Sequence, residues 1–390
     1  MDFQKYGFEK INFGCAPQTV VVGLSGGVDS SVAAAILKWQ GYNVIGLFMK
    51  NWEEQSADRR CTAEEDFSDV KRVADVLDIP YYTVNFSKQY MDSVFKMFLA
   101  GLEKGVTPNP DVLCNREIKF GPFLQHAKKI GADYIATGHY CRVQRGCSDF
   151  AEQNRLLKGA DDNKDQSYFL CGVSNAQLSK VLFPVGGLVK GQVREIATKL
   201  GLITADKKDS TGICFIGERK FREFMKEYLG NKPGEIRTLQ GEVVGKHDGL
   251  MYYTLGQRKG LGIGGQRDVA PSKIAGESGR FETLTSRWFV VRKDLKNNVL
   301  YVNNGECGEM FTKIVYAENF NWINGASKEK KFKCMAKVRY RQPDQKCEVE
   351  ILDDGKVRIT FEKPQRAVTP GQWVVLYIED VCLGGGEIIP

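Results

Sequence analysis

The pattern of apolar and polar positions divides the chain into two unlike parts. From Thr19 to about residue 205, short apolar runs alternate with stretches of helical periodicity. The apolar runs predict strands over 19–24, 42–49, 81–86 and 134–138. The helical stretches predict helices over 31–40 and 62–77, and a Thr-Ala-Glu-Glu capping box opens the second. This rhythm predicts an α/β fold with a doubly wound parallel sheet, which binds ligands at the carboxyl ends of its strands.

Past residue 209 the alternation stops. A helix over 219–229 is followed by a stretch rich in glycine, and from about 286 the pattern becomes β-like. Asp353-Asp354-Gly355 predicts a hairpin between strands at 346–352 and 356–361, and a second pair spans 372–378 and 381–389. We expect a small central domain and a C-terminal β-barrel. The predicted division is an N-terminal arm over 1–18, an α/β domain over 19–208, a central domain over 209–285 and a barrel domain over 286–390.

Composition narrows the classes of protein. The 390 residues carry a net charge of +7, which permits a polyanionic partner without demonstrating one. No apolar run approaches the ~20 residues that span a bilayer, and the first 18 residues lack a signal-peptide core, so we expect no membrane association. The 11 cysteines include no C-x-x-C pair and there are only 3 histidines, which argues against a disulfide framework or a resident metal centre. Many unpaired cysteines indicate a reducing compartment, and we expect a cytoplasmic protein.

The segment Ser25-Gly26-Gly27-Val28-Asp29-Ser30 lies between the first predicted strand and helix. Free N–H groups and the helix dipole make such a turn an anion site, and glycine lets the backbone approach phosphate oxygens closely. Asp29 would repel a phosphate unless a metal ion or a polarised water lies between them. No lysine follows the glycines, so the segment is not a Walker loop. The simpler alternative is an ordinary capped turn. The stretch 260–265 fits G-x-G-x-x-G, but Pro271 is close and no helix follows, so we interpret it as a loop.

Two cysteines have unusual neighbours. Cys114 follows Thr-Pro-Asn-Pro-Asp, and a helix that starts near Asp111 would place both residues on one face, with Cys114 where the dipole favours a thiolate. Cys214 lies between glycines and follows Lys207-Lys208, an electropositive setting. The alternative for each is a buried small apolar side chain, which we expect of Cys171, Cys334 and Cys382.

Ordered motifs along the chain carry a resemblance. The SGGVDS segment resembles the signature of the PP-loop ATP pyrophosphatases. The full set resembles the bacterial tRNA-specific 2-thiouridylase family, from about Thr19 to the C-terminus. The motifs are SGGVDSS, FMKNW, TPNPDVLCN, ATGHY, KDQSYFL, FPVG, DSTGICFIGERKFREF, TLGQRKGLGIGG, RYRQ, AVTPGQ and VCLGGG. The arm over 1–18 and the loop over 146–154 depart from the family without touching a motif.

The resemblance implies ATP-dependent exchange of the 2-oxygen of the wobble uridine of tRNA for sulfur. ATP, with Mg2+, would place AMP on the carbonyl oxygen and so create a leaving group. Cys214 would carry the sulfur as a persulfide, and Cys114 would resolve it, leaving a transient Cys114–Cys214 disulfide. Asp111 would act as general acid or base. A sulfur-relay protein or a cysteine desulfurase would supply the sulfur, and a reductant would regenerate the pair.

The resemblance also assigns binding residues. ATP would contact Gly23, Leu24, Ser25, Gly26, Gly27, Val28, Asp29, Ser30, Met49 and Gly138. The target base would lie among Asn109, Pro110 and Asp111. The tRNA would contact His139, Lys164, Asp165, Gln166, Arg339, Tyr340 and Gln372. Without the resemblance, Met49 and Gly138 suggest ordinary strand-end packing, His139 a structural histidine, and Arg339-Tyr340 a solvated strand.

Two other classes of function remain open from the residues alone. One is a PP-loop enzyme that adenylates and then adds nitrogen, of the argininosuccinate-synthetase or tRNA-lysidine type, which needs no cysteine pair. The other is a nucleotide-sensing or RNA-binding protein without chemistry, which needs neither Asp29 nor the two thiols.

Overall fold

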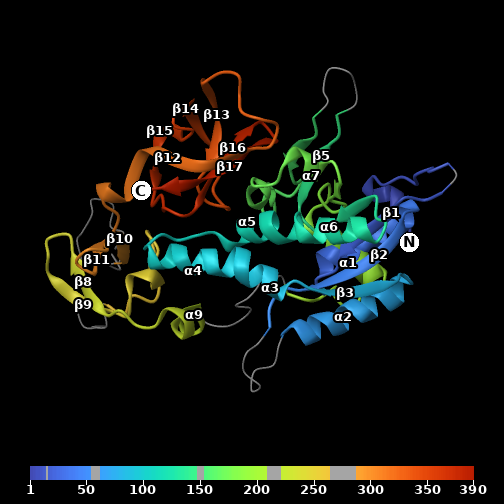
Figure 1. Ribbon diagram of the computed structural model, residues 1–390, viewed down its shortest axis with the longest axis horizontal. Helices are drawn as coiled ribbons and strands as arrows, with labels where there is room; N and C mark the ends of the chain where they lie inside the picture. Colours follow the sequence, from blue (N-terminus) through green and yellow to red (C-terminus); the bar gives the residue numbers. More distant parts are fainter. Residues whose placement is uncertain (15, 54–61, 147–152, 209–220, 264–286) are drawn as a thin grey trace, which may run out of the picture.

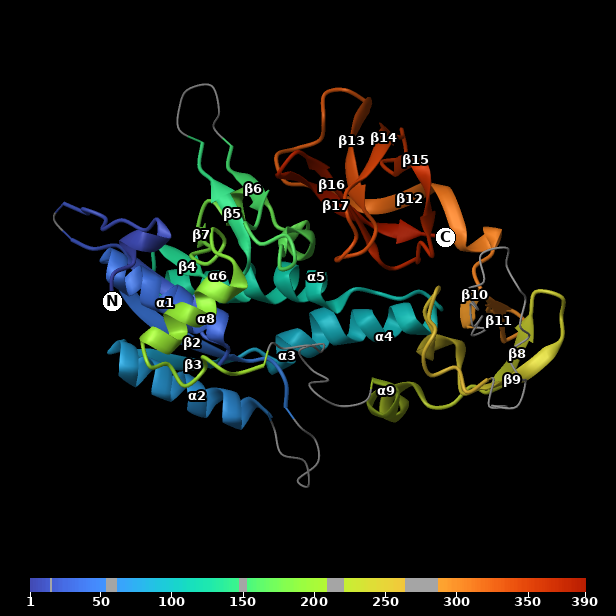
Figure 2. The same cartoon turned by 180° about the vertical axis from the view of Figure 1, so that it is seen from behind.

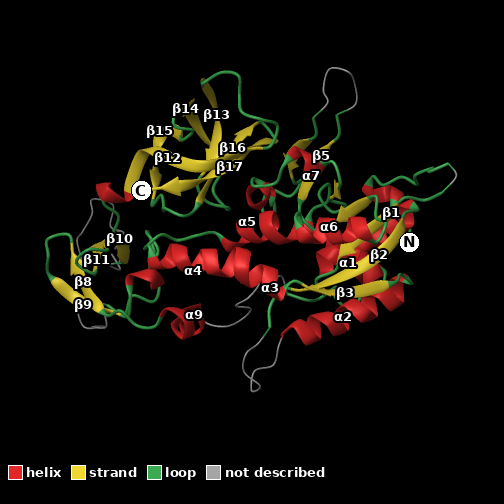
Figure 3. Cartoon of the chain, viewed as in Figure 1, coloured by secondary structure: helices red, strands yellow, loops and turns green. Residues whose placement is uncertain are grey.

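A computed structural model describes residues 1–14, 16–53, 62–146, 153–208, 221–263 and 287–390. The chain forms an α/β domain, a small central sheet and a C-terminal β-barrel (Figure 1). Helices concentrate in the first half and strands in the second (Figure 3). The predicted fold class is confirmed. Among the described residues, no helix is long and apolar enough to cross a membrane.

The α/β domain is built on a five-stranded parallel sheet with the order β3-β2-β1-β4-β7. Its strands are β1 (Thr19–Gly23), β2 (Asn43–Lys50), β3 (Tyr81–Asn85), β4 (Tyr134–Ala136) and β7 (Val181–Leu182). The four predicted strands are confirmed, and β7, only two residues long, gave no periodic signal. The strand order reverses between β1 and β4, so the carboxyl ends of these two strands form the crevice where doubly wound sheets bind ligands.

Helices cover both faces of this sheet (Figure 2). Val20 and Val22 face a core with α1, α2 and α8, whereas Val21 faces α4, α5 and α6, as the alternation of side chains along a strand requires. The helices are α1 (Val28–Gln40), α2 (Thr62–Leu77), α3 (Ser87–Tyr90), α4 (Lys96–Glu103), α5 (Pro110–Cys114), α6 (Pro122–Lys129), α7 (Asn175–Leu178) and α8 (Lys190–Lys199). The helix α1 begins at Val28, three residues earlier than predicted and directly after the two glycines.

The central unit is a second sheet with the order β10-β11-β8-β9, in which β11 and β8 are parallel. Its elements are α9 (Phe221–Leu229), β8 (Gly234–Thr238), β9 (Val243–His247), β10 (Trp288–Asp294) and β11 (Val299–Asn304). We expected the barrel to begin at residue 286, but β10 pairs with β11 and β11 pairs with β8, so both strands belong to the central sheet. That expected boundary falls too early, because alternation identifies a strand without revealing its partner.

The barrel consists of six antiparallel strands, β12-β15-β14-β13-β16-β17, closed by the pairing of β12 with β17. They are β12 (Phe311–Trp322), β13 (Lys331–Lys337), β14 (Gln345–Ile351), β15 (Val357–Arg366), β16 (Trp373–Ile378) and β17 (Val381–Ile389). The hairpin β5 (Cys141–Gln144) and β6 (Arg155–Lys158) of the α/β domain extends this sheet, since β6 pairs with β17. The α/β domain and the barrel therefore share a sheet.

The N-terminal arm packs on the far end of α1. Phe3 is buried, and its ring centroid lies 5.3 Å from that of Trp39. The Ile11 amide donates to the Gln40 carbonyl, and Phe13 contacts Tyr42. The arm thus adds apolar contacts at the end of α1 opposite the glycine-rich turn.

Candidate functional site

The glycine-rich turn after β1 has a fixed backbone shape. Gly26 has a φ of +73°, and a Cβ there would lie 2.6 Å from the Asp66 carbonyl oxygen of α2, so only glycine fits. The Ser30 and Ser31 hydroxyls both donate to the Gly27 carbonyl, at 3.1 and 2.9 Å. The turn is therefore held open, with the N-terminus of α1 at its floor, before any ligand binds.

The Asp29 carboxylate makes contacts that the sequence pattern did not reveal. Lys190 Nζ lies 2.7 Å from Oδ1 and 2.9 Å from Oδ2, and the Tyr140 hydroxyl donates to Oδ1 at 2.7 Å. Lys190 is the first residue of α8, where the helix dipole disfavours a cation. That anomaly is the signal that singles it out. The Lys190 ammonium thus neutralises the Asp29 carboxylate at the place where phosphates would bind.

The residues that follow the carboxyl end of β4 pack directly against this turn. A Cβ on Gly138 would lie 2.6 Å from the Ser30 amide nitrogen and 2.7 Å from the Asp29 carbonyl carbon. On the other side of β1, the Met49 methyl lies 3.3 Å from where a Cβ on Gly23 would be. The structure thus brings the predicted ATP residues together at one edge of the sheet.

Replacing Gly138 with alanine is expected to displace the start of α1 and weaken ATP binding at least about 5-fold, because overpacking costs about 1–3 kcal/mol. Equilibrium binding of ATP measures this. Gly308→Ala is the matched control, since nothing lies within 4 Å of its added methyl. Unchanged ATP affinity in the Gly138 variant would show that the turn tolerates the shift.

The second part of the site is α5, which begins near Asp111 as predicted. Asn109 caps it by accepting from the amides of Asp111 and Val112, at 3.2 and 3.3 Å, and Pro110 is its first residue. Cys114 is 1% exposed and lies one turn beyond Asp111. Burial raises the pKa of the Asp111 carboxyl, and the Lys119 ammonium partly opposes this. A carboxyl of this kind can hold a proton nearer neutral pH than an exposed one.

The barrel holds the loop that leads into α5, and it also contacts the central unit. The Thr107 amide donates to the Pro370 carbonyl, and Gln372 Nε2 donates to the Thr107 carbonyl at 2.7 Å. Arg339 donates to the carbonyls of Ala367 and Leu255, at 2.7 and 3.1 Å. Two of the residues assigned to tRNA by resemblance therefore make contacts between domains, and their role toward tRNA stays a prediction.

The other residues assigned to tRNA gather at the start of the short helix Ser167–Leu170. The Tyr340 ring lies 4.3 Å from that of Phe169, and its hydroxyl donates to the Lys164 carbonyl. Asp165 is buried and accepts from the amides of Gly159 and Ser167. The Asp165 carboxylate thus orders this loop, and Gln166 Oε1 likewise accepts from the Tyr140 amide.

His139 is buried with its Nδ1 2.7 Å from the Thr137 hydroxyl. Burial and Lys119 hold its pKa well below the usual range, so the imidazole is neutral. Cys171, Cys334 and Cys382 are buried as predicted. Cys214 lies outside the described residues.

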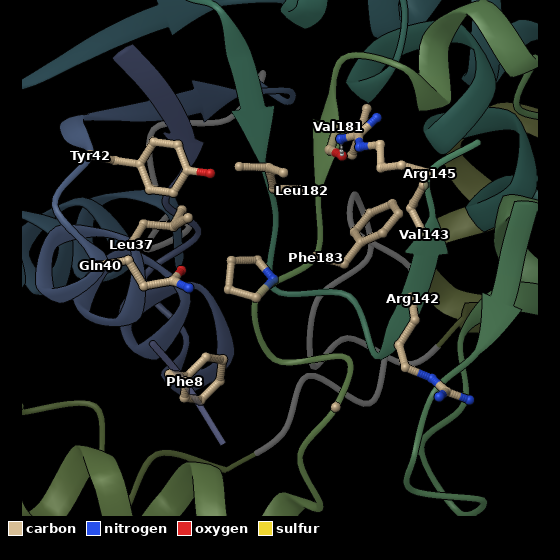
Figure 4. A pocket seen from close by; sticks show the side chains of 12 residues that line it. Phe8, Leu37, Gln40, Tyr42, Arg142, Val143, Arg145, Val181, Leu182 and Phe183 are labelled. Atoms are coloured by element: carbon tan, nitrogen blue, oxygen red, sulfur yellow. Dashed lines mark hydrogen bonds between the residues drawn. The ribbon is translucent and has the colours of Figure 1, made fainter. Parts of the chain in front are cut away.

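A separate pocket of about 430 Å3 lies at the other end of α1 (Figure 4). It is lined by Phe8, Leu37, Gln40, Tyr42, Arg142, Val143, Arg145, Val181, Leu182, Phe183, Pro184 and Gly187. Leu37 and Gln40 are nine and twelve residues beyond Val28, so about 14–18 Å of helix separates this pocket from the glycine-rich turn. It is distinct from the two parts of the site above.

An anion-binding turn at the switch point of a doubly wound sheet, with an acidic residue in its first helical turn, defines a nucleotide-binding α/β protein of the PP-loop class. Residues 18–218 match the family described as "tRNA methyl transferase HUP domain", 222–304 its PRC-barrel domain, and 312–388 the "Aminomethyltransferase beta-barrel domain". The tRNA-specific 2-thiouridylase MnmA of Listeria welshimeri is 56% identical over 370 residues, covering 95% of this chain and 94% of that protein. The MnmA of Bacillus mycoides is 55% identical with the same coverage. The chain belongs to the tRNA-specific 2-thiouridylase family and is an enzyme.

Solved structures resemble the chain more remotely. The NMN synthetase of Francisella tularensis is 17% identical, with 54% of this chain and 72% of that one covered and a TM-score of 0.31. The U34-tRNA thiolase NcsA of Methanococcus maripaludis is 17% identical, with 54% and 67% covered and a TM-score of 0.32.

Proposed function

We propose that this enzyme uses ATP to 2-thiolate the wobble uridine of tRNA, releasing AMP and pyrophosphate. The observation that carries the proposal is the joining of two sites. Gly138 packs on the glycine-rich turn, the next residue, His139, contacts Lys119, and Lys119 continues the helix that bears Asp111 and Cys114. Adenylation and sulfur transfer on one carbonyl need such neighbouring sites.

ATP would bind at the turn after β1 and at the carboxyl ends of β2 and β4. The backbone N–H groups of Gly26 to Ser30 would hold phosphate oxygens, and Met49 would lie against the adenine. The Asp29 carboxylate is a suitable Mg2+ ligand, but the described residues contain no cluster of three metal-binding side chains. Asp29 would hold the ion, and the ion would neutralise negative charge on the pyrophosphate leaving group. The Lys190 ammonium, 2.7 Å from the Asp29 carboxylate, would add positive charge beside the phosphates.

The target uracil would lie at the N-terminus of α5, among Asn109, Pro110 and Asp111. An extruded base in an anticodon loop reaches such a site at little cost, because it is already unpaired. Attack of the C2 oxygen on the α-phosphorus of ATP forms an O–P bond and expels pyrophosphate. Asp111 would move a proton to or from the base during this exchange.

Sulfur transfer then needs two thiols. The terminal sulfur of a Cys214 persulfide attacks the adenylated carbon, and AMP leaves with the original oxygen. Cys114 attacks the Cys214 sulfur, and the electron pair of the broken S–S bond stays on the sulfur attached to the base. The base is released with a thiocarbonyl, and a Cys114–Cys214 disulfide remains. A thiol reductant restores the pair with two electrons, which suits a reducing compartment such as the cytoplasm.

We propose that tRNA binds across the α/β domain and the barrel. Lys164 and Tyr340 offer a cation and an aromatic ring on adjoining segments. His139, Asp165, Gln166, Arg339 and Gln372 would act mainly by holding these segments and the loop before α5 in place. The α/β domain over 19–208 would adenylate, the central domain would carry Cys214, and the barrel would bind tRNA. A sulfur-relay protein or a cysteine desulfurase would load Cys214.

Incubating the protein with ATP, a tRNA transcript containing the wobble uridine and a cysteine desulfurase with cysteine tests the proposal. We expect 2-thiouridine in the digested tRNA and tRNA-dependent release of AMP and pyrophosphate. Nitrogen incorporation without sulfur would favour a ligase of the PP-loop class. ATP binding without tRNA-dependent pyrophosphate release would favour a nucleotide sensor.

A further inference from the structure

The helix that carries Asp111 contains a widened turn. After α5 ends at Cys114, residues Asn115–Lys119 form a π-helical turn, in which the Phe120 amide donates to the Asn115 carbonyl. Such turns are rare and are frequent at functional sites. A π turn interrupts the regular hydrogen bonds of the α-helix, so we ask which side chain this turn repositions.

The widened turn brings Lys119 onto the face of Asp111. In an uninterrupted α-helix, eight residues exceed two turns by about 80°, which would carry Lys119 around to a different face. The π turn takes about one more residue than an α turn, so residue i+8 returns to the face of residue i. The Lys119 ammonium accordingly lowers the pKa of Asp111 against the effect of burial.

His139 holds Lys119 on that side of the helix. Its Nε2 lies 3.5 Å from Lys119 Nζ, and its Nδ1 lies 2.7 Å from the Thr137 hydroxyl. Because an ammonium only donates, Nε2 accepts and the ring proton resides on Nδ1, an assignment made from this hydrogen-bond network. A neutral imidazole buried at the end of β4 therefore faces the lysine as an acceptor.

We propose that Lys119 is a positioning residue that sets the protonation of Asp111 for the base chemistry, and that the π turn and His139 exist to place it. This rests on the proposed function. Among the described residues, Lys119 on its own helix and the Tyr340 phenol from the segment after β13 interact electrostatically with Asp111, and the Cys114 thiol lies one turn away on the same helix. Burial raises the pKa of Tyr340 to about 12, so that phenol is neutral and Lys119 is the cation that balances burial.

Lys119→Met tests the proposal in two ways. In tRNA-free protein labelled with 13C-aspartate, the Asp111 carboxyl resonance, assigned with Asp111→Asn, is expected to titrate at higher pH in the variant. Removing a cation disfavours the carboxylate, so the sign is fixed. The limb of the single-turnover thiolation profile that reports Asp111 is expected to move to higher pH in the same direction, and Lys119→Arg is expected to restore both.

Controls separate this role from others. Lys96→Met removes an exposed cation of α4 that pairs with Asp92, and it is expected to move neither titration nor profile. If Lys119 instead contacts a tRNA phosphate, affinity falls, the slope of log K against log salt shrinks by about 0.9, and the Asp111 titration stays put, which overturns the proposal. Should Lys119→Met fail to fold, Lys119→Gln removes the charge with a polar side chain.

The Asp111 titration can be measured whether or not the protein thiolates tRNA. If the unaltered protein does not thiolate tRNA, the proposed function fails. If it thiolates and the Asp111 resonance titrates alike with and without the Lys119 ammonium, only this inference fails.

Discussion

Replacing Asp29 with alanine is expected to abolish tRNA-dependent pyrophosphate release, by at least about 100-fold, while tRNA binding stays within about 2-fold. The carboxylate is the acidic group at the start of α1, 2.7 Å from the Lys190 ammonium. Without it, the turn loses the carboxylate that we propose binds Mg2+, and Lys190 loses its ion pair with Asp29. Lys190→Met is expected to lower the same rate by at least about 10-fold, because the phosphates then lose a neighbouring cation.

The two substitutions are expected to be non-additive, since each removes the same ion pair. Pyrophosphate release in Asp29→Ala, Lys190→Met and the double variant measures the coupling. The matched control is Lys5→Met, which breaks an exposed pair with Glu195 on the same helix α8. Pyrophosphate release that survives the loss of Asp29 would contradict the assignment of this turn as the adenylation site.

Local patterns were enough to predict the α/β sheet and the glycine-rich turn after β1. Alternation and glycine spacing act over fewer than ten residues, and the strands β1 to β4, the helix α2 and the start of α5 all follow from them. The contact of Lys190 with Asp29 was not predicted, because 161 residues separate them and no local pattern joins them. The position of Lys119 was not predicted because its helix face depends on a π turn, whereas the helical pattern assumes regular α turns.

The barrel shows a different limit. Its hairpins were predicted from turn chemistry, but sheet membership depends on distant pairing. The strands β10 and β11 therefore belong to the central sheet and not to the barrel. The four-residue strand β6 pairs with β17, more than 200 residues away in the chain. Motif resemblance also marked Gln372 and Arg339 without revealing that each donates to the backbone of another domain.

Serine at either proposed thiol is expected to stop thiolation at a different step. Cys214→Ser cannot carry a persulfide, so 2-thiouridine formation is expected to fall by at least about 1,000-fold, with tRNA-dependent pyrophosphate release retained. Cys114→Ser still loads Cys214 with sulfur but cannot resolve the adduct. It is expected to accumulate tRNA joined to the protein through a disulfide-linked sulfur, seen as a gel shift that a thiol reductant reverses.

The two serine variants are informative together because each stops the reaction at a different step. If Cys114 carried the sulfur and Cys214 resolved it, the adduct would appear with Cys214→Ser instead, and full thiolation by that variant would sink the persulfide assignment altogether. Cys307→Ser, a half-buried cysteine near the barrel, is the control and is expected to leave both readouts unchanged. Because Cys114 is buried in α5, its serine variant must also show unchanged ATP binding and thermal unfolding. With those satisfied, a trapped adduct identifies Cys114 as the thiol that releases sulfur to the base.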